Sequence, residues 1–265
     1  MCATCGCETD VHHVLVEPGH SHDNSHTHDA LDSQSHHKSV VEIEKDVLHQ
    51  NQLYAERNRG YFEAKNILAL NLVSSPGSGK TSILEKTLID LKEQVNFSVI
   101  EGDQQTCNDA DRIYATGTKV VQINTGKGCH LDGHMVSHAI PGLNLQENSI
   151  LFIENVGNLV CPAMFDLGEK ERVVIMSVTE GDDKPLKYPD MFFTSSLCLI
   201  NKIDLLPYVP FNMEKAKEYL HRVNPNLTII EVSCTSGEGL QEWYEWLQMK
   251  HAGVPATYDN ISHSY

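Results

Sequence analysis

Short apolar runs alternate with longer mixed segments along most of the chain, from residue 67 onward. The runs are rich in Ile, Val and Phe, and most of the segments between them have room for a helix. This alternation implies crossover connections and predicts an α/β fold, with a mainly parallel sheet covered by helices on both faces. Ligands of such sheets bind at the carboxyl ends of the strands. The predicted strands are residues 67–73, 97–101, 119–124, 149–154, 173–178, 197–201 and 228–232.

The stretch from Val40 to Phe62 has a different period. Its apolar positions recur every three to five residues among charged ones, which is typical of a helix with one apolar stripe. Gly60 marks the predicted end of this helix. We expect the stripe to dock on the domain that follows. Its members are Val40, Ile43, Val47, Leu48 and Leu53.

The first 37 residues differ in composition from the rest of the chain. They contain eight of the 15 His, three of the eight Cys and six carboxylates, but no Lys, Arg or aromatic residue. Residues 8–37 have too little apolar surface to offset the entropy of ordering them, so we expect a disordered tail there. The chain therefore divides into a Cys- and His-rich tail at 1–37 and a folded domain at 38–265.

Charge and hydropathy exclude several classes of protein. The 36 acidic and 20 basic residues leave a net charge of −16, the wrong sign for a general nucleic-acid binder. The tail lacks the basic residues of a secretory or mitochondrial targeting peptide. No apolar stretch approaches the roughly 18–20 residues of a membrane-spanning helix. We therefore expect a cytoplasmic protein that binds neither nucleic acid nor membrane.

A phosphate-binding loop follows the first predicted strand directly. Residues 74–81 read SSPGSGKT and lead into a helical segment at 82–94, which is the strand–loop–helix context of a P-loop. Small residues let backbone N–H groups surround a phosphate, Lys80 reaches the β and γ phosphates, and the Thr81 hydroxyl ligates Mg²⁺. Ser74 replaces the usual first glycine, which the loop tolerates if Ser74 keeps a strand-end conformation. The predicted nucleotide contacts are Pro76, Gly77, Ser78, Gly79, Lys80, Thr81 and Ser82.

A second motif selects the base. Residues 201–204 read NKID after a predicted strand, as the N-K-x-D motif does in GTP-binding proteins, and Asn201, Lys202 and Asp204 are its contacts. The Asp204 carboxylate accepts hydrogen bonds from guanine N1 and the exocyclic amine, and adenine has no such donor pair. Ser233 and Cys234 stand where these proteins approach guanine O6. Alone the motif is compatible with a surface turn; downstream of a P-loop it predicts a GTP site.

Two acidic residues at strand ends are candidates for sensing the third phosphate. Asp103 follows the second predicted strand, and Glu154 ends the fourth in a sequence, ENVG, that resembles a D-x-x-G switch. Phosphoryl transfer needs charge neutralisation and a positioned water. We therefore assign Lys80, Asp103 and Glu154 to catalysis, the two acids through Mg²⁺ or the attacking water. The alternative is that each acid caps the helix that follows it.

Three further residues have the chemistry of a transition-metal site. Cys129 and His130 follow the third predicted strand, and Cys161 lies four residues after Gly157. If the third and fourth strands open toward the same sheet edge, these side chains converge as a thiolate–imidazole–thiolate site for Zn²⁺ or Ni²⁺ beside the phosphate sensor. The domain's other thiols are expected to be small core residues. These are Cys107, Cys198 and Cys234.

The N-terminus has a second set of metal ligands. If Met1 is removed, Cys2 offers its amine and its thiolate, and Cys5 and Cys7 complete three sulfurs and one nitrogen. This set favours square-planar Ni²⁺. The alternative is a redox pair or adventitious metal capture. The scattered tail histidines are consistent with a weaker metal reservoir, and the pair His134 and His138, four residues apart, is either a further ligand pair or surface residues.

Together these motifs resemble a known family. From Val40 to the C-terminus the chain is similar to the hydrogenase-maturation nickel-insertion GTPases, the HypB family, and the CxxCxC terminus resembles that of the subgroup with an added nickel site. Within this family Ser74 is not a departure. The matching stretches are residues 73–81, 101–106, 108–113, 128–132 and 154–162.

The resemblance implies a SIMIBI-class P-loop GTPase that forms a GTP-dependent homodimer and slowly hydrolyses GTP to GDP and phosphate. It implies nickel delivery to the large subunit of [NiFe]-hydrogenase with a zinc-containing accessory protein of the HypA type, and a His-rich nickel-binding peptidyl-prolyl isomerase is a further candidate partner. It also implies that Cys129, His130 and Cys161 bind zinc or nickel near the dimer interface. A second dimer contact of the family is similar in sequence to the segment that contains Leu205 and Val209.

Our hypothesis is that GTP closes the loops at Asp103 and Glu154, changes the metal coordination and promotes dimerisation. One rival is the urease-maturation GTPase, whose metal motif inserts Pro between Cys and His, whereas Cys129 and His130 are adjacent. A second rival is a nickel storage protein in which the GTPase is only a folded carrier. A signalling or translation GTPase leaves the metal clusters unexplained.

Overall fold

The computed structural model describes residues 12–15, 40–104 and 108–253. Part of the predicted chemistry lies outside these residues: the nickel site at Cys2, Cys5 and Cys7, the tail histidines after residue 15, and Cys107. The domain expected at 38–265 is described between residues 40 and 253, apart from 105–107.

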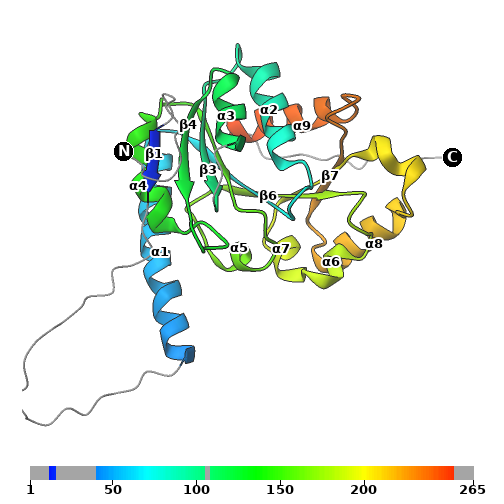
Figure 1. The fold of residues 1–265 in the computed structure, drawn as a ribbon, viewed down its shortest axis with the longest axis horizontal. Coiled ribbons are helices and arrows are strands. Elements are labelled where there is room, and N and C mark those ends of the chain that lie inside the picture. Colours follow the sequence, from blue (N-terminus) through cyan, green and yellow to red (C-terminus); the bar gives the residue numbers. More distant parts are fainter. Residues whose placement is uncertain (1–11, 16–39, 105–107, 254–265) are drawn as a thin grey trace, which may run out of the picture.

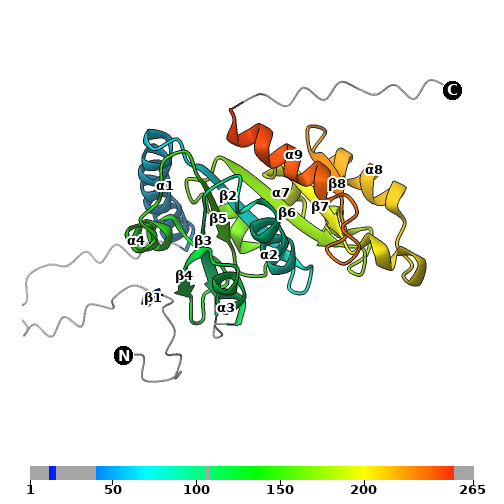
Figure 2. The same cartoon turned by 90° about the horizontal axis from the view of Figure 1, so that it is seen from above.

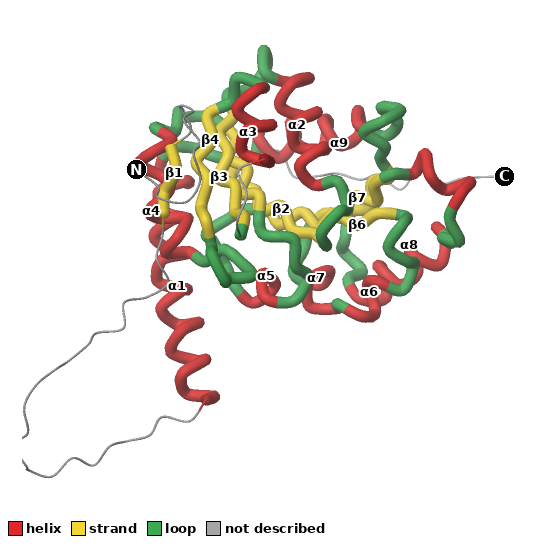
Figure 3. The backbone as a smooth tube through the Cα atoms, viewed as in Figure 1, coloured by secondary structure: helices red, strands yellow, loops and turns green. Residues whose placement is uncertain are grey.

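Among the described residues eight parallel strands form one sheet (Figure 3), in the spatial order β1-β4-β3-β5-β2-β6-β7-β8 (Figure 2). All seven predicted strands are present, with ends that differ from the predicted ones by at most two residues. The predicted parallel sheet is therefore confirmed. The strands are β1 His12–Leu15, β2 Leu68–Ser74, β3 Phe97–Asp103, β4 Lys119–Asn124, β5 Ile150–Glu154, β6 Glu171–Ser177, β7 Leu197–Asn201 and β8 Thr228–Glu231.

Strand β1 departs from the expectation of a tail disordered from residue 8 to residue 37. It pairs with β4, so that His12 lies beside Val121 and Leu15 beside Asn124. Without it β4 would be the edge of the sheet, and an edge presents unpaired N–H and C=O groups to any extended segment. The stretch VHHVLV at residues 11–16 is the most apolar part of the tail, and a composition averaged over thirty residues conceals it.

The helices cover both faces of the sheet, as predicted (Figure 1). Helices α2, α3 and α9 pack on one face, and α1, α4 and α5 to α8 lie on the other. No helix among the described residues is both long and apolar enough to span a membrane. The helices are α1 Val40–Ala64, α2 Lys80–Leu91, α3 Asn108–Ala115, α4 Gly133–Leu143, α5 Cys161–Met164, α6 Lys184–Lys187, α7 Pro189–Phe193, the 3₁₀ helix η1 Ile203–Tyr208, α8 Met213–Val223 and α9 Leu240–His251.

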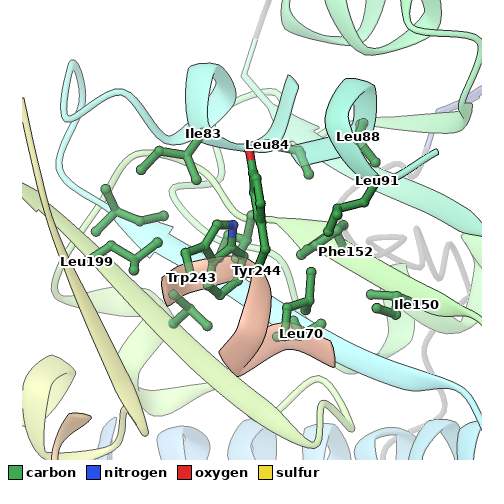
Figure 4. Packing of buried hydrophobic residues seen from close by; sticks show 14 of the residues in the cluster. Leu70, Ile83, Leu84, Leu88, Leu91, Ile150, Phe152, Leu199, Trp243 and Tyr244 are labelled. Atoms are coloured by element: carbon green, nitrogen blue, oxygen red, sulfur yellow. The ribbon is translucent and has the colours of Figure 1, made fainter. Parts of the chain in front are cut away.

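Two aromatic residues of α9 fix helix α2 on the sheet. Trp243 is 1% exposed, and its indole N–H donates to Thr87 Oγ1 at 2.8 Å. The Tyr244 hydroxyl donates to Asp90 Oδ2 at 2.8 Å. Figure 4 shows both rings among aliphatic side chains of α2 and of the sheet. Because the polar atoms of both rings are bonded, their apolar surface is buried without an unpaired donor.

Helix α1 is longer than predicted and buries a different face. It runs through Gly60 to Ala64, so Gly60 does not end the helix as predicted. Three members of the predicted apolar stripe face solvent: Val47, Leu48 and Leu53 are 49%, 38% and 54% exposed. The predicted docking face was therefore wrong at these three positions, because the buried face of α1 consists of Asn51, Ala55, Asn58 and Phe62.

The docked face of α1 is built on two buried asparagines. Asn58 Nδ2 donates to the carbonyls of Gly133, at 2.8 Å, and Leu167, at 3.0 Å. Asn51 donates to the carbonyl of Asp166 at 2.8 Å and accepts from the Gly133 N–H at 2.7 Å. These bonds fasten α1 to the start of α4 and to the loop after α5, the segments that flank the predicted metal site.

Replacing Asn58 tests this docking. Asn58→Ala removes two buried hydrogen bonds, so the free energy of unfolding should fall by about 1–3 kcal/mol in urea titrations. Leu53→Ala on the same helix is the matched control, and its exposed side chain should change the value by less than about 0.5 kcal/mol. A larger loss in Leu53→Ala than in Asn58→Ala would contradict the assignment of the docked face.

Candidate functional site

The strand order brings the predicted site residues to one edge of the sheet. Strand β2 lies between β5 and β6, and β3 and β4 follow beyond β5 (Figure 2). Because the strands are parallel, the loops after β2, β3, β4 and β5 open at the same edge, where α/β sheets bind ligands. A cavity of about 570 Å³ lies there. Its lining includes residues 74–82, Asp103, Asp109, Arg112, Gly157 and Lys202.

The phosphate loop has a backbone conformation that requires its glycines. Ser74 ends β2 in register with Ile175 of β6 and so keeps the expected strand-end conformation. Gly77 and Gly79 have φ angles of +77° and +93°, which side chains other than glycine rarely allow. A Cβ on Gly79 would also lie 2.3 Å from Asn201 Nδ2. Position 79 therefore needs glycine both for its conformation and for close contact with the guanine motif.

Two side chains of the guanine motif hold the phosphate loop directly. Asn201 Nδ2 donates to the Ser78 carbonyl at 2.8 Å, and Lys202 Nζ donates to the Gly77 carbonyl at 2.6 Å. Lys202 has a φ of +63°, which turns the chain from β7 into η1. The motif predicted to select the base therefore also shapes the loop predicted to bind phosphate.

The two segments predicted to contact the base lie side by side. Ser233 Oγ donates to Asp204 Oδ1 at 2.6 Å, and Ser233 is fully buried. Cys234 is half-buried, and burial raises the pKa of its thiol to about 11, so it is a neutral thiol at physiological pH. It packs at the margin of the core, as expected for a small apolar residue.

Glu154 contacts both functional side chains of the phosphate loop. Its Oε1 accepts from Lys80 Nζ at 2.7 Å and from Thr81 Oγ1 at 2.6 Å. The side chain is fully buried, and Oε2 has no hydrogen-bond partner among the described residues. A half-bonded carboxylate beside a hydroxyl is an oxygen donor set of the kind that Mg²⁺ takes, so these residues fit that ion. The bonds go to the phosphate loop, so Glu154 is not a helix cap.

Asp103 reaches the cavity from the neighbouring strand. It ends β3, two residues beyond Glu101, which lies opposite Glu154 in the β3–β5 ladder. Its Oδ1 accepts from the Gln104 N–H at 2.7 Å, which is a turn contact, since α3 begins only at Asn108. The two acids assigned to phosphate sensing therefore approach the same edge from adjacent strands.

Glu101 is a third acid of this edge, and it is buried. The residue is 2% exposed and lies opposite Glu154. Burial, and then the negative charge of Glu154, raises the pKa of Glu101 to about 9, although Lys80 opposes the shift. The Glu101 carboxyl is therefore protonated at neutral pH in the protein without nucleotide, which relieves repulsion between the two acids.

Cys129, His130 and Cys161 converge, as predicted. Cys129 Sγ lies 3.0 Å from Cys161 Sγ and 3.7 Å from His130 Nδ1, and all three ligand atoms lie within 4.8 Å of one another. His130 stacks on Phe165, and burial lowers its pKa, which favours the neutral imidazole that binds metals. The hydrogen bond to Cys161 and burial raise the pKa of Cys129. Two thiols and one imidazole at this spacing fit a single Zn²⁺ or Ni²⁺ ion.

Two asparagines connect the metal loop to the end of β5. Asn155, directly after Glu154, accepts a hydrogen bond from the Leu131 N–H at 3.1 Å and is fully buried. Asn158 Nδ2 donates to the Cys129 carbonyl at 3.2 Å. The segment that follows Glu154 is therefore bonded to the backbone of the loop that carries Cys129 and His130.

The other predicted metal and core residues have simpler environments. His134 and His138 lie on α4 with their Nε2 atoms 3.0 Å apart, and His134 meets the Tyr54 ring edge-on. Neither belongs to the group formed by the two cysteines and His130 among the described residues. Cys198 is fully buried in the core, as predicted.

Comparison with known proteins agrees with this arrangement. Residues 68–231 match the CobW/HypB/UreG nucleotide-binding domain family. The hydrogenase maturation factor HypB of Escherichia coli K12 is 60% identical over 211 residues, which are 80% of this chain and 73% of that protein. The chain belongs to the HypB family of hydrogenase maturation factors. A probable HypB of Methanocaldococcus jannaschii is 42% identical over 213 residues, 80% of this chain and 96% of that one.

Two solved HypB structures share the fold. The structure from Archaeoglobus fulgidus is 39% identical, with a TM-score of 0.72, and covers 77% of this chain and 99% of its own. HypB from Helicobacter pylori, solved in complex with nickel, is 36% identical, also with a TM-score of 0.72, and covers 79% and 99%. These matches confirm the predicted fold class, the SIMIBI-class P-loop GTPase domain.

The residues that connect the nucleotide cavity to the group formed by Cys129, His130 and Cys161 do not stand out in the sequence of this HypB-family chain. Asn155 and Asn158 fall in a stretch that resembles the family, but their amides bond groups more than twenty residues away, which no local pattern encodes. Glu101 gives one signal, because it is a charged residue that ends an apolar run. Arg112, which lines the cavity, falls in the matching stretch 108–113, but nothing in that stretch marks it as a residue of the cavity.

The raised pKa of Glu101 makes stability depend on pH. Because the folded value of about 9 lies above the ordinary 4.5, folding takes up a proton, and the free energy of unfolding should fall as pH rises between these values. Glu101→Gln mimics the protonated form and removes this dependence. In urea titrations without nucleotide or metal, the variant should exceed wild type at about pH 8 and approach it at about pH 5.

Glu93→Gln, at an exposed position just after α2, is the control for this measurement and should show no such trend. A difference between Glu101→Gln and wild type that is the same at both pH values would show that Glu101 is ionised in the folded protein.

Proposed function

We propose that this HypB-family protein is a GTP-hydrolysing nickel metallochaperone that delivers Ni²⁺ for assembly of the [NiFe]-hydrogenase active site. One observation carries the proposal: Glu154 bonds Lys80 and Thr81, and the adjacent Asn155 bonds the loop of the metal ligands. The end of strand β5 therefore contacts both the phosphate loop and the loop that carries the proposed metal ligands. The nickel complex of the Helicobacter pylori relative supports nickel as the cargo.

In the proposed reaction, GTP is hydrolysed to GDP and phosphate. The phosphate loop binds the phosphates through backbone N–H groups, and Lys80 neutralises the charge that develops on them. Thr81, Asp103 and Glu154 are the residues that would hold Mg²⁺, which supplies further charge neutralisation when bound. Asp204 selects guanine through N1 and the exocyclic amine.

The same contacts connect nucleotide to metal. In the structure Lys80 is bonded to Glu154, so phosphates that attract Lys80 alter the position of Glu154 and of Asn155 next to it. A shift of Asn155 would displace the loop that carries Cys129 and His130, because the Leu131 N–H of that loop bonds Asn155. The ligands around a bound Ni²⁺ or Zn²⁺ ion would then be rearranged. A coupling of about 1–3 kcal/mol is enough to change metal affinity several-fold or more.

Partners follow from the same proposal. Residues Cys2, Cys5 and Cys7 collect nickel, and a GTP-dependent homodimer with Leu205 and Val209 in one contact presents it. A HypA-type zinc protein and the hydrogenase large subunit act with this chain in the cytoplasm, and a His-rich nickel-binding peptidyl-prolyl isomerase is a further source of the metal.

Separating the two activities tests the proposal. Asp204→Asn exchanges a carboxylate for an amide that can donate to the second carbonyl of xanthine, so the full chain should lose GTP hydrolysis, gain XTP hydrolysis and keep nickel binding at the N-terminal cysteines. A triple Cys2/Cys5/Cys7→Ala variant should lose that tight nickel site and keep GTP hydrolysis. The measurements are phosphate release and nickel titration.

In cells that lack the native protein, hydrogenase activity should fall in both variants. Full hydrogenase activity with Asp204→Asn would contradict a GTP-driven delivery step and would favour a nickel store with a GTPase as carrier.

A further inference from the structure

One basic side chain of the nucleotide cavity is not explained by the motifs of the site. Among the described residues that line the cavity, three are basic: Lys80, Arg112 and Lys202. Lys80 bonds Glu154 and belongs to the phosphate loop, and Lys202 bonds that loop from the guanine motif. Arg112 comes from α3, outside both motifs, and its guanidinium is the one such group on the lining.

Arg112 is held at the cavity by contacts with helix α2 and with Asp109 of its own helix. Its Nη2 donates to Ser82 Oγ at 3.2 Å and to Glu85 Oε2 at 2.6 Å, and its Nη1 donates to Asp109 Oδ1 at 3.3 Å. Helices α2 and α3 lie side by side (Figures 1 and 2). The Arg112 side chain is 41% exposed, so the guanidinium is oriented by its partners and still open to a ligand.

Of the two residues of α2 that Arg112 touches, Ser82 lines the cavity, and it gives the place of Arg112 along the phosphates. Lys80 and Thr81 serve the terminal phosphates and Mg²⁺, and they meet Glu154. Arg112 contacts Ser82 instead, one residue further along α2, where the helix has turned by about 100° away from Thr81. The loop binds the α and β phosphates and Lys80 reaches the β and γ phosphates, so the α-phosphate is the one left for a group on the Ser82 side.

We propose that Arg112 binds the α-phosphate of both GDP and GTP; this rests on the proposed function, in which the cavity binds guanine nucleotides. A guanidinium offers paired donors that match two phosphate oxygens. The longer contact, to Asp109, is the one that the phosphate replaces, and the shorter bond to Glu85 keeps the group oriented.

This position predicts an effect on binding and none on chemistry. The α-phosphate is present in GDP and GTP, and its charge does not change when the γ-phosphoryl group is transferred. A contact made equally in substrate, transition state and product lowers Kd and KM and leaves kcat unchanged. An arginine that stabilised the γ-phosphoryl group would change kcat instead.

The first arm of the test measures Kd for GDP and for a non-hydrolysable GTP analogue with the full chain. Arg112→Ala should weaken both by roughly 10- to 100-fold, as expected for a lost charge-assisted hydrogen bond, with kcat unchanged. Arg112→Lys should recover part of the loss, because it restores the charge without the paired geometry. Lys217→Ala, which removes an ion-paired cation of α8, is the matched control and should change neither Kd.

The second arm uses GDP with sulfur in place of one non-bridging oxygen of the α-phosphate. Sulfur accepts hydrogen bonds poorly, so in wild type one of the two diastereomers should bind more weakly than GDP. In Arg112→Ala the Kd of that diastereomer divided by the Kd of GDP should approach one. A purely structural role of Arg112 would weaken GDP and both sulfur analogues by the same factor, and an unchanged ratio would therefore overturn the inference.

The remaining outcomes separate this inference from the proposed function. Equal Kd values in wild type and Arg112→Ala overturn the inference alone, and so does a loss of kcat with unchanged GDP affinity. A wild-type chain that binds neither GDP nor the GTP analogue overturns the proposed function together with the inference.

Discussion

The functional edge of this protein depends on one buried ion pair, between Lys80 and Glu154. Their side chains are 11% and 0% exposed, and removing one partner of such a pair costs about 3–5 kcal/mol. Lys80 begins α2 and Glu154 ends β5, so the pair fixes the phosphate loop against the sheet. Nucleotide phosphates compete for the same ammonium group. If the phosphates bind Lys80, the buried Glu154 carboxylate loses its ion-pair partner, and Mg²⁺ fits as the replacement cation.

The residues directly after Glu154 contact the loop that carries two of the proposed metal ligands. Glu154 is followed directly by Asn155, which bonds the Leu131 backbone, and then by Gly157, where a Cβ would lie 3.1 Å from the Pro76 backbone. The segment is in contact with the phosphate loop on one side and the metal loop on the other. A packed segment of this kind has little room to move for one site alone, and it is the route by which we propose that the two sites are coupled.

Much of this could be predicted from the sequence, because the information is local. Every described strand except β1 contains a short run rich in apolar residues, and the phosphate loop, guanine motif and Cys129–His130 pair each lie within a few residues. The docked face of α1 could not be predicted, because Asn58 bonds carbonyls 75 and 109 residues away. The same holds for Asn155 and Arg112: an amide or guanidinium has many possible partners, and only the assembled fold selects among them.

The most direct test of the account is nickel affinity at Cys129, His130 and Cys161 in two nucleotide states. The Cys2/Cys5/Cys7→Ala chain removes the competing thiols, and nickel is titrated with GDP or with a non-hydrolysable GTP analogue, each with Mg²⁺. The account predicts affinities that differ about 5- to 150-fold, and a smaller difference in Asn158→Ala, which lacks the bond to the Cys129 carbonyl. Equal nickel affinities in the two states would contradict it.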